Sequence, residues 1–212
     1  MKMKSLKDLL AEQLKDLYSA ENQLVKALPK MAKAAENEQL RHGFEQHLEQ
    51  TRHQVERIEK ICERLDITPK GKKCTAMVGL ITEGKELMSE DADADVLDAG
   101  LIAAAQKVEH YEIASYGSAR TWAEQLGLRE AVSLLEETLN EEKETDQKLS
   151  HLATEMINEH AKHGEDGDGE PSGRQHRELG QEREHEDGQR HSGAMQQHDG
   201  RKSEPEMHEA GR

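Results

Sequence analysis

The sequence predicts an all-α protein: an antiparallel four-helix bundle with an extra short helix in a crossover, followed by a disordered C-terminal tail. Three observations predict this fold. Apolar residues recur at helical spacing through four long segments, a connection rich in helix breakers separates the second segment from the third, and the composition changes abruptly near Asn158. We therefore expect a helical bundle over residues 1–158 and an acidic, His- and Gly-rich tail over residues 159–212.

The first two segments are predicted to form a helical hairpin. The first helix begins at Ser5, a suitable N-cap that Asp8 follows three residues later. Pro29 should kink this helix or mark a break near it, after which the periodicity resumes to about Glu36. The second helix runs from about Leu40 to Leu65, and the short connection before it makes the two helices antiparallel neighbours.

A second hairpin follows a long crossover. The connection over 66–73 is rich in breakers, and a shorter amphipathic helix is expected over 75–88. The third helix should span about 96–126 and end at Gly127, a C-cap residue, and the fourth should span about 129–158. One crossover that joins two helical hairpins is the arrangement of ferritin-like bundles.

The tail lacks the residues that build a core. From Asn158 onward there is no Ile, Val, Phe, Tyr or Trp, and Leu179 is the only Leu. Such a segment cannot bury enough apolar surface to offset its ordering entropy of about 1–2 kcal/mol per residue. Weak metal scavenging is one reading of its histidines, and a solvated low-complexity tail is the simpler one; these histidines are His160, His163, His176, His185, His191, His198 and His208.

Charge and composition exclude several classes of function. A formal net charge of −15, with no basic stripe, argues against nucleic-acid binding. No apolar run reaches the roughly 20 residues that span a bilayer, and the N-terminus lacks the apolar stretch of a signal peptide. Cys62 and Cys74 do not form a disulfide framework. We therefore expect a cytoplasmic protein without nucleic-acid or membrane partners.

Several acidic residues lie on the apolar stripes near mid-helix, where they would point into the core. Burial of a lone charge costs several kcal/mol, and a pair of divalent metal ions is the usual solution in such bundles. The alternative for any one of them is a boundary residue whose carboxylate reaches water. Repetition on three helices at matched depth favours metal binding by Glu21, Glu109, Glu112, Glu142 and Asp146.

The second helix offers weaker candidates. Glu49 and His53 are one turn apart, yet they lie opposite the apolar stripe and should face solvent or a partner subunit. The inward or flanking polar residues are His47, Thr51 and Gln54. His47 is a candidate metal ligand, although such a histidine is more often a satisfied boundary residue, and Gln54 could offer an amide oxygen.

Several runs resemble the YciE/YciF family of bacterial ferritin-like stress proteins. The most specific is Leu101 to Gly117, with the sequence LIAAAQKVEHYEIASYG, and shorter runs begin at Tyr18, His47, Lys73 and Glu141. The similarity covers about residues 5–157, with the motifs in the right order, and does not include the tail.

This resemblance implies a homodimer of bundles similar to the diiron domain of rubrerythrin. The Glu-His-Tyr-Glu run of rubrerythrin's third helix is repeated at Glu109 to Glu112, and Glu21 and Glu142 occupy corresponding places. The departure is in the second helix, where Thr51 to Gln54 stands in place of a Glu-x-x-His motif. The resemblance also implies a role in general, osmotic and oxidative stress, with catalase- or peroxidase-like activity.

The leading hypothesis is therefore a cytoplasmic, dimeric stress protein that holds one or two iron or manganese ions and acts on peroxide. Carboxylate ligands suit these metals. A second hypothesis is a non-catalytic bundle with a vestigial metal site that acts in protein interaction. A third, a mineral-storing or DNA-protecting cage of many subunits, fits neither the extended tail nor the acidic charge.

Overall fold

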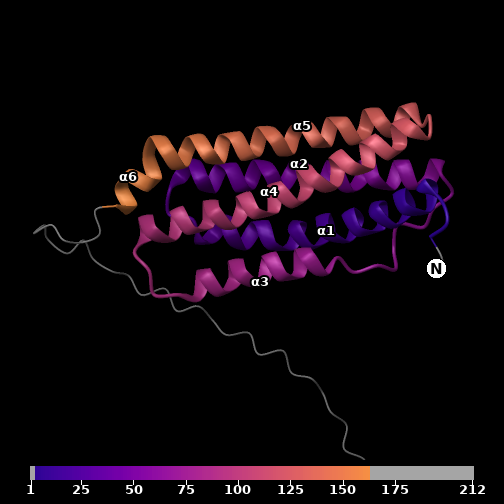
Figure 1. The fold of residues 1–212 in the computed structure, drawn as a ribbon. Helices are drawn as coiled ribbons and strands as arrows, with labels where there is room; N and C mark the ends of the chain where they lie inside the picture. Colours follow the sequence, from indigo (N-terminus) through magenta and orange to yellow (C-terminus); the bar gives the residue numbers. More distant parts are fainter. Residues whose placement is uncertain (1–2, 163–212) are drawn as a thin grey trace, which may run out of the picture. The chain divides into compact units, whose positions relative to one another are not determined.

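The computed structural model describes residues 3–162, which form an all-helical bundle (Figure 1). Most of the predicted tail lies outside the described residues. Within them, no helix combines the length and the hydropathy needed to cross a membrane. The elements in chain order are α1 (Leu6–Ala34), α2 (Glu38–Arg64), α3 (Thr75–Ser89), α4 (Ala94–Gln125), α5 (Arg129–Leu152), the π-helical turn η1 (Ala153–Ile157) and α6 (Asn158–Ala161).

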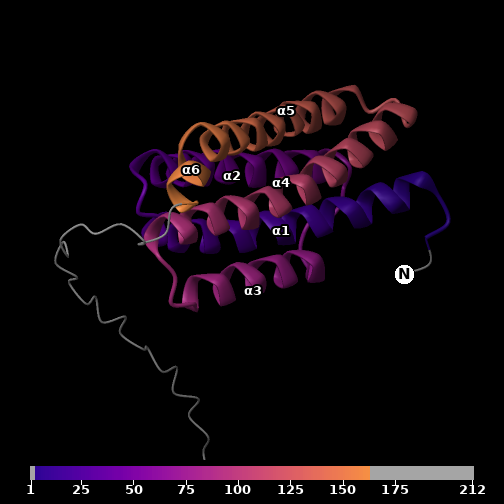
Figure 2. The same cartoon turned by 60° about the vertical axis from the view of Figure 1, so that its left-hand side comes forward.

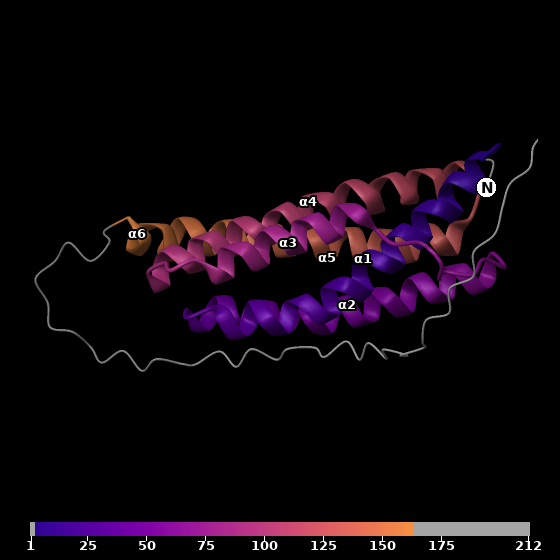
Figure 3. The same ribbon diagram turned by 90° about the horizontal axis from the view of Figure 1, so that it is seen from below.

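Four long helices make up the bundle, as the sequence predicted. α1 packs against α2 and α4, and α5 packs against the same two helices, so α1 and α5 lie on one diagonal of the bundle. Figures 1 and 3 show that neighbouring helices run in opposite directions. After α2, the crossover with α3 carries the chain back along the length of the bundle to the start of α4. This is the predicted ferritin-like connectivity.

The first hairpin has well-formed helix caps. Ser5 Oγ accepts a hydrogen bond from the Asp8 amide, which confirms the predicted N-cap of α1. α1 continues through Pro29 without a break. A residue of α4 stabilises the connection between α1 and α2. The buried carboxylate of Asp98 accepts hydrogen bonds from the amides of Glu36 and Asn37 at 3.0 and 2.7 Å.

The second hairpin also follows the prediction, with one difference at its end. Gly127 has a φ of 70°, the left-handed conformation expected of a helix C-cap glycine. The predicted fourth helix, however, is not one regular helix. It changes to a π-helical turn at Ala153–Ile157 and then continues as α6 to Ala161, three residues beyond the predicted domain boundary.

The crossover helix α3 packs against α4 and α1, on the outside of the bundle (Figure 2). Cys74 caps its N-terminus and fixes it to the bundle. The Cys74 amide donates to Ser19 Oγ at 2.9 Å, and its thiol lies 3.0 Å from the Tyr111 hydroxyl. Tyr111 in turn donates to Asp16 at 2.5 Å, so this tyrosine links α3, α4 and α1 rather than only packing.

The core consists of two apolar clusters at opposite ends of the bundle. The α6-side cluster includes Leu24, Leu40 and Leu149, and the N-terminal-side cluster includes Leu14 and Ile58. The buried glutamates of α1, α4 and α5 fall between these clusters along each helix. The fold therefore places a polar layer in the middle of an otherwise apolar core.

Candidate metal centre

Four glutamates form the polar layer, and none of their carboxylates reaches water. The exposed fraction is 0% for Glu21, Glu112 and Glu142, and 2% for Glu109. Helical spacing places them there: Glu112 lies one turn from Val108 in one apolar cluster and one turn from Tyr116 in the other. Their burial excludes the alternative of boundary residues with solvated carboxylates.

His47 of α2 lies against this layer, as its position on the inner face predicted. Its ring is 3% exposed, and Nε2 lies 3.4 Å from Glu109 Oε1 and 3.8 Å from Glu142 Oε2. Nδ1 lies 3.5 Å from the hydroxyl of Thr145. Each of His47, Glu109, Glu112 and Glu142 offers one ligand atom, and these four atoms lie within 4.8 Å of one another. Nitrogen and oxygen donors so close together can share a metal ion.

Glu21 and Gln54 extend the polar layer beyond these four residues. The Tyr116 hydroxyl donates a 2.5 Å hydrogen bond to Glu21 Oε1, which leaves Oε2 without a partner. Gln54 is fully buried, and its amide nitrogen donates to Glu141 Oε2 at 3.0 Å. Its amide oxygen has no partner and is therefore free to act as a ligand atom.

An ion-pair network behind Gln54 fixes its orientation. Both carboxylate oxygens of Glu141 accept hydrogen bonds from Arg57, at 2.6 and 2.7 Å. Burial opposes ionisation of Glu141, but the hydrogen bonds from Arg57 and Gln54 outweigh it and lower the pKa of this carboxyl. An ionised Glu141 can only accept hydrogen bonds, so Gln54 must present its nitrogen to it and its oxygen elsewhere.

Asp146, the fifth acidic residue predicted as a ligand, lies outside the group of four. Its side chain is 21% exposed, accepts a hydrogen bond from Gln106, and lies 3.5 Å from His110 Nε2. It follows Glu142 by one turn of α5, but at the edge of the stripe, where the carboxylate turns outward. Glu49 and His53 are exposed on α2, which confirms that they do not point into the core.

Burial in this layer opposes ionisation of every glutamate. Burial raises the pKa of Glu21 to about 8, although the hydrogen bond from Tyr116 acts in the opposite direction. Burial raises the pKa of Glu109 too, partly offset by His47. The pKa values of Glu112 and Glu142 lie well above the usual range, because burial and neighbouring carboxylates both disfavour the charged form. Without cations, the layer therefore holds protons at neutral pH.

The donor set suits divalent cations. Many buried polar atoms in this layer have no hydrogen-bond partner: Glu21 Oε2, His47 Nε2, Gln54 Oε1, Glu109 Oε2, both carboxylate oxygens of Glu112 and both of Glu142. Buried polar groups are normally satisfied, so such a concentration calls for an explanation. Cations that replace protons would satisfy these atoms and neutralise the carboxylates together. One imidazole among several carboxylates is a donor set that suits divalent transition-metal ions.

Comparisons with known proteins identify the family. A family described as a domain of unknown function, DUF892, matches residues 5–162. The chain belongs to the DUF892 family. It is 52% identical to protein YciF of Escherichia coli over 162 residues, which are 76% of this chain and 98% of that protein.

Solved structures of similar proteins support the bundle. The crystal structure of the E. coli stress protein YciF matches with a TM-score of 0.71 and 52% identity, over 74% of this chain and 99% of that one. YcfI from Rhodopseudomonas palustris matches with a TM-score of 0.68 and 46% identity, over 70% of this chain and 95% of that one. The matches thus cover the bundle, and nearly all of each relative.

The sequence did not predict the residues that hold the side chains of the polar layer in place by hydrogen bonds. Tyr116 lies one turn from Glu112, and its hydroxyl donates to Glu21. Glu141 and Arg57 showed no signal, because their roles depend on the contact between α2 and α5. Thr145 lies one turn before Leu149, and nothing in the sequence pattern indicates its position beside His47.

Proposed function

We propose that this DUF892 protein is a cytoplasmic stress protein that binds one or two iron or manganese ions in its core and acts on peroxide. The observation that carries the proposal is the group of buried, unpartnered oxygen and nitrogen atoms on four helices. The stress role is supported by the relative YciF of E. coli, which is described as a stress protein.

The residues divide into two sets within the layer. His47, Glu109, Glu112 and Glu142 would hold one ion, because their ligand atoms already lie together. Glu21 and Gln54 would contribute to a second ion beside Glu112, whose carboxylate interacts with that of Glu21. Iron or manganese, when bound, supplies the Lewis acidity and the electrons that peroxide chemistry needs.

The chain's own residues would set the geometry and the proton balance. Tyr116 fixes one oxygen of Glu21, and Glu141 with Arg57 fixes Gln54, so each of these ligands is oriented before metal binds. The pKa of Tyr116 is raised well above its usual value by burial and by the nearby carboxylates, which keeps its hydroxyl a proton donor. The apolar clusters flank the layer on both sides.

Metal content per chain tests this proposal. The full chain is prepared without an affinity tag, in wild-type form and as Glu109→Gln with Glu142→Gln, after anaerobic loading with iron or manganese and removal of free ions. A variant truncated after Asn158 separates core binding from binding by the tail histidines. We expect one to two ions per wild-type chain, independent of the tail and lost in the double variant.

Peroxide turnover by the loaded wild-type protein is measured next. A core that binds no ion after loading would overturn the metal-binding proposal and leave the non-catalytic interaction bundle. An occupied core without peroxide turnover would overturn only the enzymatic part. Exposed Glu144 provides a control for the α5 substitution, since Glu144→Gln replaces one carboxyl of α5 outside the layer.

We also propose that the protein is a homodimer, as the family resemblance implies. Light scattering after gel filtration should give twice the chain mass of 23.9 kDa. A mass of one chain, or of a large assembly, would contradict it.

A further inference from the structure

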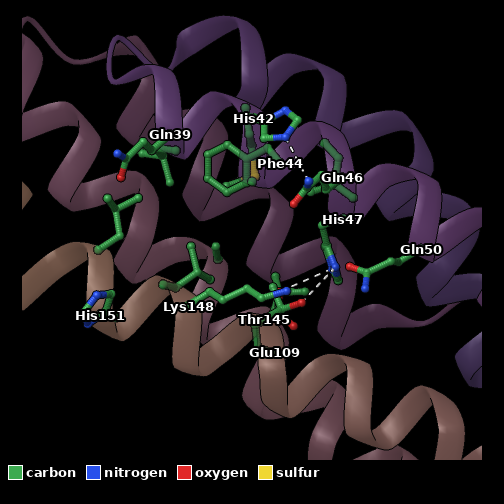
Figure 4. A pocket seen from close by; sticks show the side chains of 18 of the residues that line it. Gln39, His42, Phe44, Gln46, His47, Gln50, Glu109, Thr145, Lys148 and His151 are labelled. Atoms are coloured by element: carbon green, nitrogen blue, oxygen red, sulfur yellow. Dashed lines mark hydrogen bonds and ion pairs between the residues drawn. The ribbon is translucent and has the colours of Figure 1, made fainter.

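A pocket of about 370 Å³ opens between α2 and α5 and leads to the candidate metal centre. Its walls come from α1, α2, α4, α5 and η1, and they are mostly apolar: Leu24, Leu28, Leu40, Phe44, Val108, Leu149 and Leu152. Two residues of the polar layer, His47 and Glu109, also line it (Figure 4). The pocket therefore has an apolar inner wall, and its polar lining consists of His47 and Glu109 in the core together with exposed side chains such as Gln39, Gln46 and Lys148.

His47 and Glu109 present free polar atoms at this place. The exposed fractions of the two residues are 3% and 2%, and His47 Nε2 and Glu109 Oε2 have no hydrogen-bond partner. Figure 4 shows the His47 ring directed toward Glu109 and Thr145. A ligand in the pocket could place one small polar group here.

The size and lining of the pocket argue against hydrogen peroxide as its only occupant. One water needs about 10–15 Å³ of such space, and peroxide only little more, so the volume far exceeds that need. A volume above ~300 Å³ with an apolar inner wall is typical of sites for organic molecules. Water against this inner wall has few partners, and an apolar body that displaces it would gain the free energy of burial.

Small residues keep the pocket open. Gly43 lies in the interior of α2, and a Cβ built there would meet no heavy atom within 4 Å. Ala105, one turn before Glu109 on α4, is 5% exposed and also lines the pocket. The polar mouth includes Lys148 of α5, for which no ion pair is found within the described part of the chain.

We propose that this pocket binds the chain of a medium-length alkyl hydroperoxide, with its oxygen head at His47 and Glu109. The assignment of a hydroperoxyl head group rests on the proposed function, because a centre that acts on peroxide binds such a group. The alkyl chain is inferred from the volume and apolar inner wall of the pocket, independently of any metal. The organic substrate class is thus a property of the cleft between α2 and α5 and not of the carboxylate layer.

Binding of unreactive linear alcohols tests the pocket without turnover. Calorimetry on the full-length, metal-free protein compares 1-butanol, 1-hexanol, 1-octanol and 1-decanol. Affinity should rise about fourfold for each added methylene, since burial of a methylene is worth about 0.8 kcal/mol, until the pocket is full. Affinity that does not depend on chain length would overturn the proposal.

Two variants fill the pocket without changing a proposed ligand. Gly43→Leu and Ala105→Phe should each weaken 1-octanol binding at least tenfold. Gly79→Leu is the matched control, because Gly79 is an exposed helical glycine with the same open space around its Cβ and does not line the pocket. Unchanged 1-octanol binding in both filled variants would show that the alcohol binds elsewhere.

The position of the head group is tested separately on manganese-loaded protein. 1-Octanol should alter the electron paramagnetic resonance spectrum of the bound Mn²⁺, and the spectrum of Ala105→Phe should not respond. Binding without a spectral change would overturn the assigned orientation. If the core binds neither manganese nor iron after loading, the proposed function fails, while the chain-length series on metal-free protein still decides whether the pocket takes an alkyl chain.

Discussion

The two ends of the bundle core are built from similar residues but packed in different ways. At the N-terminal side, Leu14, Ile58 and Tyr116 belong to a cluster in which their side chains are fully buried or nearly so. At the α6 side, Leu40 and Leu149 are also buried, yet they border the pocket of about 370 Å³. The carboxylate layer lies between the two ends. The comparison teaches that the larger open space, which reaches His47 and Glu109 of the carboxylate layer, lies at the α6 side.

The largest expected effect compares one leucine from each end. Leu14→Ala should lower the free energy of unfolding by about 3–5 kcal/mol, because a fully buried leucine in close packing leaves a cavity. Leu149→Ala should cost less, about 2–3 kcal/mol, because this side chain already borders open space. Urea unfolding of the metal-free protein measures both. Equal losses would contradict the difference in packing.

Removal of one buried carboxyl should change stability in opposite directions with and without metal. Glu112→Gln should stabilise the metal-free protein at pH 8 by a few kcal/mol, because it removes a carboxyl whose ionisation burial disfavours. The same variant should lose the stabilisation that added iron or manganese gives the wild type. Thermal unfolding with and without metal measures both effects. Glu144→Gln should change neither the stability of the metal-free protein nor its stabilisation by metal.

The same carboxyls set a pH dependence of the metal-free protein. An unfolded glutamate ionises near pH 4.5, whereas the folded pKa of Glu21 is about 8 and that of Glu112 lies well above 4.5. The folded state therefore binds more protons between these values, and the layer's contribution to stability falls as the pH rises. The gain from Glu112→Gln should be small at pH 5 and large at pH 8. A gain independent of pH would show that Glu112 does not titrate in this range.

A smaller effect is expected where α4 holds the turn between α1 and α2. Asp98→Asn should lower the free energy of unfolding by about 1–3 kcal/mol, because the amides of Glu36 and Asn37 lose a charged acceptor in a buried place. Asp95→Asn is the matched control, since Asp95 is exposed in the first turn of the same helix. Urea unfolding compares the two, and equal losses would contradict the role of Asp98.

The smallest effect concerns glycines near the open end. Gly43→Ala should raise the free energy of unfolding by about 0.5–1 kcal/mol, because alanine favours the helix and its Cβ has free space. Gly100→Ala should gain less, since its Cβ would lie 2.9 Å from Leu87 Cδ2. Differential calorimetry separates these values. A larger gain at Gly100 would show that Leu87 moves aside without cost.

Much of the fold was predictable because helices are local. The caps at Ser5 and Gly127 depend on neighbouring residues, and the structure confirms both. The inward positions of Glu21, Glu109, Glu112, Glu142 and His47 follow from the period of 3.6 residues, which the sequence displays directly. The exposed positions of Glu49 and His53 follow from the same period.

Contacts between helices decided the rest. Asp146 lies near the stripe of Glu142, but it pairs with Gln106 and His110, which only the packing of α4 on α5 could determine. The π-helical turn after Leu152 and the clamp of Asp98 on the α1–α2 turn have no local signal. The contacts of Asp98 join residues 62 and 61 positions apart in the chain.

The sequence by itself determined the helical elements, their caps and the set of acidic residues that face inward, because each depends on local propensity and periodicity. Only the tertiary structure decided which of these acids meet His47, how Glu141 orients Gln54, and where the core is left open beside Gly43 and Ala105. These features depend on distances between helices, which side-chain packing sets and a one-dimensional pattern does not record.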